Sequence, residues 1–269
     1  HSGRGHYGCA MKLHGLISSV LRLALCCTCG TAAAQNFPAG PLRIIVPFPP
    51  GGGTDILARP VAQKLNERFK QPVVIENRGG ANGTIGTAYV AKSAPADGHT
   101  LLFIPSGYAV NPSLYPALPY DQARDLAAVT QLVSGPLTLV VHPSLPAKNV
   151  RELIALAKSK PGKLNYSTGG SGTTSHFGME LFKSVTATDI VHIPFKGIAP
   201  ATVSLIAGEV DVMMNTTPPA LPQVRAGRLR ALAMASLKRT TFAPDVPTLV
   251  ESGLPGFEDR KSTRLNSSH

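Results

Sequence analysis

The chain has 269 residues, a hydrophobic fraction of 43% and a formal net charge of +11, which is enough apolar material for the core of one large or two small domains. Its cations are scattered, and no dense basic run is interleaved with aromatic residues, which argues against a nucleic-acid-binding protein. The positive charge instead favours small anions as partners.

The first 34 residues are interpreted as segments that precede the mature domain. Residues 1–10 have no pattern, and we take them for non-native or upstream translation. Residues 11–34 fit a secretory signal peptide, with a charged start at Lys12, an apolar stretch and small residues before Gln35. This pattern predicts export to the periplasm, with a lipoprotein signal or a retained membrane anchor as the alternatives.

The mature chain is expected to lack cysteine. All four cysteines lie before residue 35, at Cys9, Cys26, Cys27 and Cys29. A chain without them has no disulfide, no thiol nucleophile and no cysteine-based zinc site. No H-E-x-x-H motif or carboxylate cluster indicates a metal, so we predict neither a metal nor a cofactor.

The last residues, 259–269, read DRKSTRLNSSH and show no apolar periodicity. We interpret them as the translation of a sequencing adapter, and a genuine polar tail is the alternative. On this interpretation the natural protein is represented up to Glu258, and its open reading frame is truncated there.

The first motif of the mature chain joins a strand, a glycine loop and a helix within residues 42–58, LRIIVPFPPGGGTDILA. The apolar run at its start predicts a buried strand, and the three glycines let a backbone approach a ligand closely. We expect Thr54 or Asp55 to cap the helix, whose free N–H groups and dipole favour an anion. A tight turn without a ligand is the alternative, and Asp55 disfavours a bare phosphate unless its carboxylate turns inward.

Strands and helices alternate through the rest of the chain, which predicts an α/β fold with mostly parallel sheet. The helix after the glycine loop runs to Phe69, and Pro60 is expected to weaken or bend its first turns. From Pro119 the pattern is looser, up to a strand at 137–141. The remaining strands are expected at 73–75, 100–104, 164–167, 191–194, 210–214 and 229–234, and the remaining helices around 85–91, 150–158, 176–182, 203–207 and 221–224.

A second strand–glycine–helix device occupies residues 168–176, TGGSGTTSH, in the second half of the chain. Small or polar residues also follow the strands near 77–83, 105–107 and 215–217. Ligands of open α/β sheets bind outside the carboxyl ends of the strands. Two anion-favouring helix starts, one in each half, therefore predict a cleft that clamps a small acid.

Several motifs in a fixed order carry a family resemblance, namely PFPPGGGTD, ENRGGANGTIG, GKLNYSTGGSGTTSH, LIAGEVD and DVPTLVESGLPGFE. Over residues 41–258 the chain resembles the Bug-type extracytoplasmic solute receptors, which are associated with tripartite tricarboxylate transporters. The resemblance implies a periplasmic binding protein of the type II topology, with two lobes and a ligand cleft between them. It implies lobe 1 in residues 35–119, the crossing segment and lobe 2 in 120–236, and a truncated return to lobe 1 in 237–258, which would leave an exposed sheet edge.

The resemblance also implies a function, which is capture of a small carboxylate for uptake, with membrane transport subunits as partners and a monomeric receptor. Family receptors hold the ligand through main-chain groups and waters. Family members often have an aspartate near Asn215, so the neutral residue here leaves the ligand's identity open. By motif, the implied contacts are Phe48, Gly51, Gly52, Thr54, Asp55, Ser106 and Gly107 in lobe 1, and Ser167, Thr168, Gly169, Gly172, Thr173, His176, Lys196, Gly197, Asn215 and Thr216 in lobe 2.

Two other functions are the alternatives. A receptor of this kind can instead feed a membrane sensor kinase, because lobe closure serves both purposes. An α/β hydrolytic enzyme would use Ser171 and His176, but Thr173 breaks the G-x-S-x-G pattern and no third partner is assignable. We therefore expect no catalytic residues.

Overall fold

The computed structural model describes residues 37–255 and Phe257. The predicted signal peptide, the four cysteines and the predicted adapter-derived tail lie outside the described residues. All elements below belong to the unit formed by residues 40–269. Among the described residues, no helix has both the length and the apolar character needed to cross a membrane.

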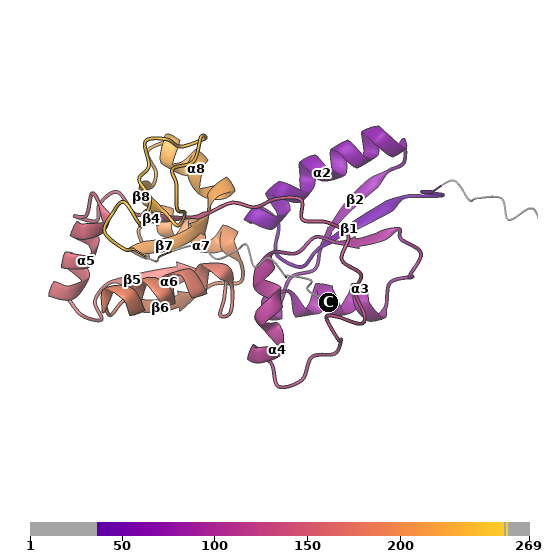
Figure 1. Ribbon diagram of the computed structural model, residues 1–269, viewed down its shortest axis with the longest axis horizontal. Coiled ribbons are helices and arrows are strands. Elements are labelled where there is room, and N and C mark those ends of the chain that lie inside the picture. The colour runs from indigo at the N-terminus through magenta and orange to yellow at the C-terminus, as the bar shows by residue number, and fades with distance from the viewer. Residues whose placement is uncertain (1–36, 256, 258–269) are drawn as a thin grey trace, which may run out of the picture. The chain divides into compact units, whose positions relative to one another are not determined.

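A three-stranded parallel sheet forms the first half of the fold, with strand order β2-β1-β3 (Figure 1). Its members are β1 (Leu42–Val46), β2 (Val73–Asn77) and β3 (Thr100–Leu102). The helices α2 (Gly53–Phe69) and α3 (Thr84–Lys92) follow β1 and β2, as parallel connections require. Shorter helical turns complete this half, at η1 (Ala81–Gly83), η2 (Ser106–Val110) and α4 (Asn111–Leu114).

A five-stranded sheet forms the second half, in the order β6-β5-β7-β4-β8. The strands are β4 (Leu137–Val141), β5 (Asn165–Thr168), β6 (Val191–Pro194), β7 (Val212–Thr216) and β8 (Arg230–Met234). This sheet is mixed, because β4 runs antiparallel to both of its neighbours, β7 and β8. The helices are α5 (Val150–Ser159), α6 (Thr174–Thr186), α7 (Ile198–Ile206) and α8 (Thr217–Arg225).

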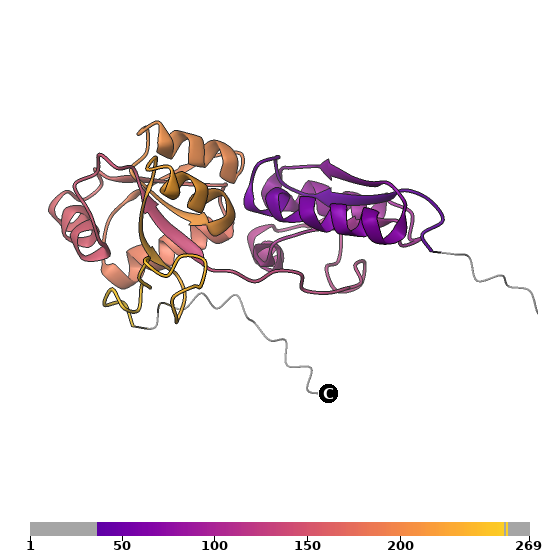
Figure 2. The same cartoon turned by 90° about the horizontal axis from the view of Figure 1, so that it is seen from above.

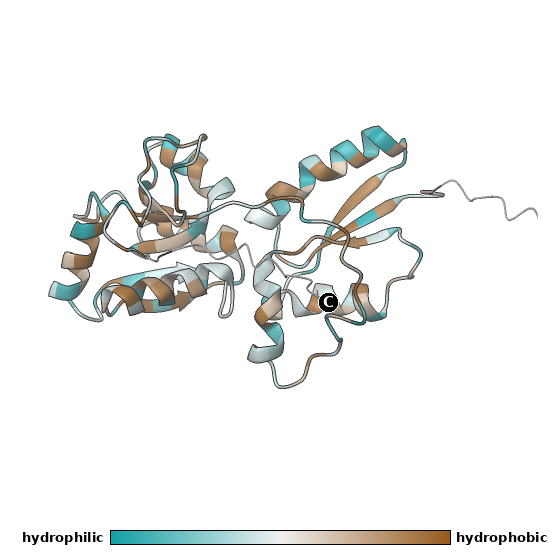
Figure 3. Ribbon diagram, viewed as in Figure 1, coloured by the Kyte–Doolittle hydropathy of each residue, from teal (hydrophilic) through white to brown (hydrophobic). Residues whose placement is uncertain are grey.

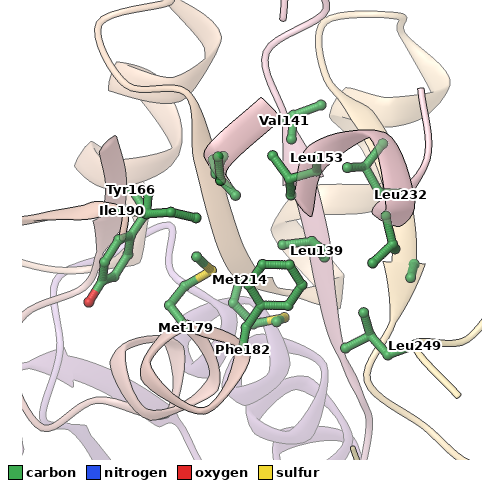
Figure 4. Close-up of a cluster of buried hydrophobic side chains, with 14 of the residues drawn as sticks. Leu139, Val141, Leu153, Tyr166, Met179, Phe182, Ile190, Met214, Leu232 and Leu249 are labelled. Atoms are coloured by element: carbon green, nitrogen blue, oxygen red, sulfur yellow. The ribbon is translucent and has the colours of Figure 1, made fainter. Parts of the chain in front are cut away.

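The second sheet buries apolar side chains on both of its faces. One core gathers Phe182 and Met179 of α6 with Leu139 and Met214 of the sheet (Figure 4). The other core packs α7 and α8 against side chains such as Val140 and Met213. All five residues of β4 are buried, which agrees with its largely apolar sequence. Figure 3 shows apolar residues along the strands and hydrophilic residues toward the C-terminal end of α2.

The helix α2 runs from Gly53 to Phe69 as a single helix with Pro60 inside it. Proline removes one backbone N–H from the hydrogen-bond ladder, but it does not end this helix. The helix ends at Lys70, which has the left-handed backbone conformation that commonly closes a helix. The expected weakening at Pro60 therefore does not interrupt the helix behind the glycine loop.

The segment 237–257 differs from its prediction. It packs against the five-stranded sheet, because Thr248 bridges to Met234 and the side chains of Leu249, Leu254 and Phe257 lie in the first of the two cores. Figure 2 shows this segment beside the second sheet. The predicted return to the first lobe does not occur within these residues, because their apolar side chains are buried in the second lobe's core.

Candidate functional site

The glycine loop after β1 leads into α2 through Gly52, which is the N-cap residue and makes no side-chain capping bond. The expectation that Thr54 or Asp55 caps the helix is therefore wrong, since both lie in its first turn. The carboxylate of Asp55 instead reaches back and accepts a hydrogen bond from the Gly51 N–H at 3.0 Å. This contact closes the loop from within and fixes the direction in which the helix begins.

The side chain of Asp55 is turned inward and is almost fully buried, at 1% exposure. Its oxygens accept hydrogen bonds from Arg59, at 3.0 and 3.2 Å, and from the Asn77 amide at 3.1 Å. Burial alone would raise the pKa of Asp55, but the hydrogen bonds from Gly51, Asn77 and Arg59 outweigh it, so the pKa lies below its ordinary value. The negative charge is thus satisfied inside the protein, and we assign Asp55 a positioning role.

Replacing this carboxylate is expected to destabilise the loop. Asp55→Asn places an amide N–H₂ among three donors, so we expect a loss of about 2 kcal/mol in the free energy of unfolding, as for a charged hydrogen bond. Because the folded pKa is lowered, the carboxylate's contribution is full above its ordinary value of 3.8 and is lost as pH falls through the folded value.

Urea denaturation at pH 7 and at pH 3 measures this effect. We expect the difference between wild type and Asp55→Asn to shrink at the lower pH. Lys64→Gln is the matched control, because the ion pair of Lys64 with Glu67 on the same helix is exposed on both sides, at 78% and 47%, and an exposed ion pair is worth about 0–1 kcal/mol. A loss for Lys64→Gln as large as that for Asp55→Asn would contradict the assignment.

The three glycines of the loop lie directly against the second half of the protein. A β-carbon placed on Gly51 would lie 3.5 Å from the Ala199 side chain, and one on Gly52 would lie 3.8 Å from Ile198. A β-carbon on Gly53 would lie 2.6 Å from the Thr216 hydroxyl, so only glycine fits there. Gly53 was not among the predicted contacts, although the run of three glycines was the signal for it.

These contacts bring the N-termini of three helices together. Ile198 and Ala199 begin α7, and Thr216 is the N-cap residue of α8, while Gly52 is the N-cap residue of α2. The first backbone N–H groups of a helix have no partner within it, and the helix dipole is positive at this end. Three such ends from two sheets form a region that favours a bound anion.

The end of β7 adds two unpartnered polar atoms to this region. Among the described residues, neither Asn215 Oδ1 nor Thr216 Oγ1 has a hydrogen-bond partner, and both atoms are buried. The Asn215 amide donates to Thr202 Oγ1 at 2.9 Å, which itself donates to the Ile198 carbonyl at 2.8 Å. Buried polar atoms without partners are costly, so this pair is suited to a ligand or a water.

The second glycine loop, residues 168–173, leads into α6. Thr173 is the N-cap residue, and its hydroxyl accepts from the His176 N–H at 3.3 Å, so the helix begins earlier than the predicted residue 176. The Gly172 carbonyl accepts a hydrogen bond from Asn82 of the first half at 3.0 Å. A β-carbon on Gly107 would lie 3.0 Å from Thr174. This contact of Asn82 was not predicted, because the polar turn that contains Asn82 gives no indication in the sequence of which distant residue it meets.

The remaining predicted contact residues differ in how their side chains or backbones are placed around the two glycine loops. The Phe48 ring packs near Gly83, while the half-buried Thr54 lies in the first turn of α2. Ser106 and Lys196 are exposed side chains beside these loops. The buried hydroxyls of Ser167 and Thr168 bond within the second half, to the Ala201 carbonyl and to His192. The backbones of Gly169 and Gly197 closely approach Ile198 and Pro49 respectively.

Metal ligands and other pockets would be sites for different chemistry. No cluster of three or more His, Cys, Asp or Glu side chains among the described residues could hold a metal ion. A separate pocket in the first half is lined by residues that include Lys92, Tyr115 and Arg124, and it shares no residue with the two glycine loops.

Comparison with known proteins identifies the family. Residues 57–265 match the family model of the tripartite tricarboxylate transporter family receptor, TctC. The chain belongs to this receptor family. The chain is 44% identical over 235 residues to the protein BugT of Bordetella pertussis. The aligned region covers 86% of this chain and 72% of BugT.

Solved structures agree with the fold of the receptor. A protein of R. palustris solved with adipate superposes with a TM-score of 0.80 at 38% identity, covering 83% of this chain and 75% of that one. MatC from Rhodopseudomonas palustris, solved with bound malate, gives a TM-score of 0.75 at 35% identity, covering 82% and 76%. The periplasmic binding protein BugD superposes with a TM-score of 0.78 at 36% identity, and the match covers 82% of this chain and 74% of BugD. The predicted two-lobed α/β receptor fold is confirmed.

Proposed function

We propose that this receptor binds a small carboxylate where the N-termini of α2, α7 and α8 meet, and that it supplies this ligand to the membrane subunits of a tripartite tricarboxylate transporter. The observation that carries the proposal is the contact of the Gly51–Gly53 backbone with Ile198, Ala199 and Thr216. This contact joins positive helix ends from both sheets around one small region.

The energetics suit a carboxylate. A helix N-terminus stabilises a negative charge by about 0.3–1 kcal/mol at an exposed site and by up to about 2 kcal/mol when partly buried. Three such ends therefore supply several kcal/mol before any side chain contributes. The Thr216 hydroxyl can donate to a carboxylate oxygen, and the inward charge of Asp55 is neutralised by Arg59 and so does not oppose the ligand.

The solved relatives support the same ligand class. One holds adipate and another holds malate. Both molecules carry two carboxylates, but the carbon chain that joins the carboxylates differs. The proposed site recognises the shared group mainly through backbone N–H groups, which leaves the rest of the ligand to the surrounding loops.

We further propose that the receptor is exported through residues 11–34 and acts in the periplasm as a monomer. We also propose that it binds its ligand without catalysing a reaction. The exposed Ser171 has no hydrogen bond to His176 among the contacts of the described residues. His176 Nδ1 instead accepts from the Gly172 N–H at 3.2 Å, so this nitrogen is not placed to activate a nucleophile.

Calorimetry and thermal unfolding of the purified receptor test the proposal. We expect adipate or malate to bind, and the uncharged diamide of adipate not to bind. At a ligand concentration of 100 times the Kd, binding stabilises the folded state by about 2.7 kcal/mol, which raises the melting temperature by several degrees. Equal binding of the diamide, or no shift with any member of a panel of small carboxylates, would refute the proposal.

A further inference from the structure

A stack of three rings lies behind the second glycine loop. Tyr166 of β5 stacks on His192 of β6, with ring centroids 4.9 Å apart and planes inclined by 17°. His192 stacks in turn on His176 of α6, with centroids 4.4 Å apart and an angle of 24°. Two imidazoles at this separation are compatible with neutral rings, whereas two imidazolium cations would repel each other.

Each histidine holds one part of the loop. His176 Nδ1 accepts the Gly172 N–H at 3.2 Å. His192 Nε2 lies 2.7 Å from Thr168 Oγ1, which also accepts the Gly170 N–H at 3.2 Å. Residues 168–173 are thus anchored at their start by one ring and near their end by the other.

The hydrogen bond to Gly172 determines where protons can be on His176. A neutral imidazole that accepts at Nδ1 carries its hydrogen on Nε2. The proton that makes the ring cationic must then go to Nδ1, where it takes the place of the Gly172 N–H. The cation would also lie in the first turn of α6, where the helix dipole disfavours positive charge.

The charged neighbours of the pair leave it without a free counter-ion. Glu180 of α6 accepts hydrogen bonds from the Tyr166 hydroxyl at 2.5 Å and from Lys183 at 2.7 Å. Burial lowers the pKa of both histidines, and Lys183 lowers each further, as does His176 for His192, while Glu180 opposes the shift. Both shifts favour the neutral form of the rings.

We propose that His176 and His192 are positioning residues that hold the 168–173 loop in its ligand-binding form only while both rings are neutral, so that acidification lowers the affinity for carboxylates. This inference rests on the proposed function. It is opposite in sign to a direct contact between His176 and the ligand, because a protonated imidazole touching a carboxylate would strengthen binding.

The test compares the pH profiles of binding. Adipate and malate are titrated by calorimetry between pH 7.5 and pH 5.5 into wild type and into the double variant His176→Asn/His192→Gln. The Asn oxygen can replace Nδ1 as an acceptor and the Gln amide can replace Nε2, but neither titrates. Because the ligands also take up protons in this range, the wild type is compared with the variant at each pH.

We expect acidification to weaken binding to wild type about 5- to 10-fold more than binding to the double variant, as loss of one or two hydrogen bonds would. His142→Gln is the matched control, since His142 bonds to Ser144 at 2.7 Å and belongs to neither the stack nor the loop. It should follow the wild type at every pH. Equal profiles for wild type and double variant, or tighter binding to wild type in acid, would overturn the inference.

A measurement without ligand separates this inference from the proposed function. The backbone amide resonance of Gly172 should shift with pH in wild type and in His142→Gln, and should not shift in the double variant His176→Asn/His192→Gln. If neither carboxylate binds at pH 7.5, the proposed function fails for these ligands while the Gly172 resonance still tests the loop. A resonance that does not respond to acid in wild type refutes the role of the histidines, whatever the binding data.

Discussion

A single added β-carbon at Gly53 is expected to weaken carboxylate binding by about 10-fold or more. That carbon would lie 2.6 Å from the Thr216 hydroxyl and 3.0 Å from the Thr216 β-carbon. A rotation of the threonine side chain relieves the first contact but not the second, so the N-termini of α2 and α8 must move apart. Overpacking of this kind costs about 1–3 kcal/mol, and about 1.4 kcal/mol corresponds to a tenfold change in affinity.

The neighbouring glycine provides the control for this prediction. A β-carbon on Gly52 would make only ordinary contacts, 3.7 Å from the Pro49 carbonyl and 3.8 Å from Ile198. Its φ of −77° is open to any residue. Calorimetry should therefore show Gly52→Ala within about fivefold of wild type, since Ala in place of Gly at an N-cap costs under about 1 kcal/mol. Equal affinities for Gly53→Ala and Gly52→Ala would show that the close contact does not govern binding.

The largest effect on stability is expected from Phe182→Ala, at about 3–5 kcal/mol, the usual cost of emptying a large buried aromatic site. Phe182 is fully buried in the core beneath the second sheet, where its ring lies near Met179, Met214 and Leu139 (Figure 4). These neighbours come from α6 and from two strands, so they cannot all close the cavity that the substitution leaves.

The adjacent residue on the same helix is a matched control for the cavity effect. Leu181 is 43% exposed, so Leu181→Ala also truncates a large apolar side chain on this helix but opens no core cavity. We expect it to lower the free energy of unfolding by less than about 1 kcal/mol in urea denaturation. A similar loss for both variants would mean that the helix, rather than the core, determines the stability of this region.

Several strands were predicted closely. The strand β1 lies in the apolar run that begins the first motif, and the predicted bounds of β4 and β6 are the observed ones. Both β1 and β4 are mostly apolar, and their apolar side chains are buried. The strand β3 ends at Leu102 rather than at 104, because only Thr100 to Leu102 pair with β1. The helix α6 begins at Thr174 rather than at the predicted residue 176. Its capping residue, Thr173, could not be told apart from the other small polar residues of the loop in the sequence.

The two glycine loops and the helices behind them were predictable from local patterns, because a glycine run between an apolar strand and a helical pattern marks a turn or a close backbone approach whatever the rest of the chain does. The partners of these loops were not predictable in this way. Gly53 meets Thr216, and Asn82 meets Gly172, across long sequence separations that no local pattern records.

The sequence by itself determined the alternating α/β pattern, the position of both glycine loops between a strand and a helix, and the family to which the chain belongs. Only the tertiary structure decided that Asp55 turns inward, that segment 237–257 joins the second sheet, and that His176 stacks on His192. Local patterns follow from hydrophobic periodicity and backbone freedom, which act over a few residues. The direction of a side chain and the choice of a partner depend on which surfaces the folded chain brings together, and burial and hydrogen bonding decide these only once distant segments are in contact.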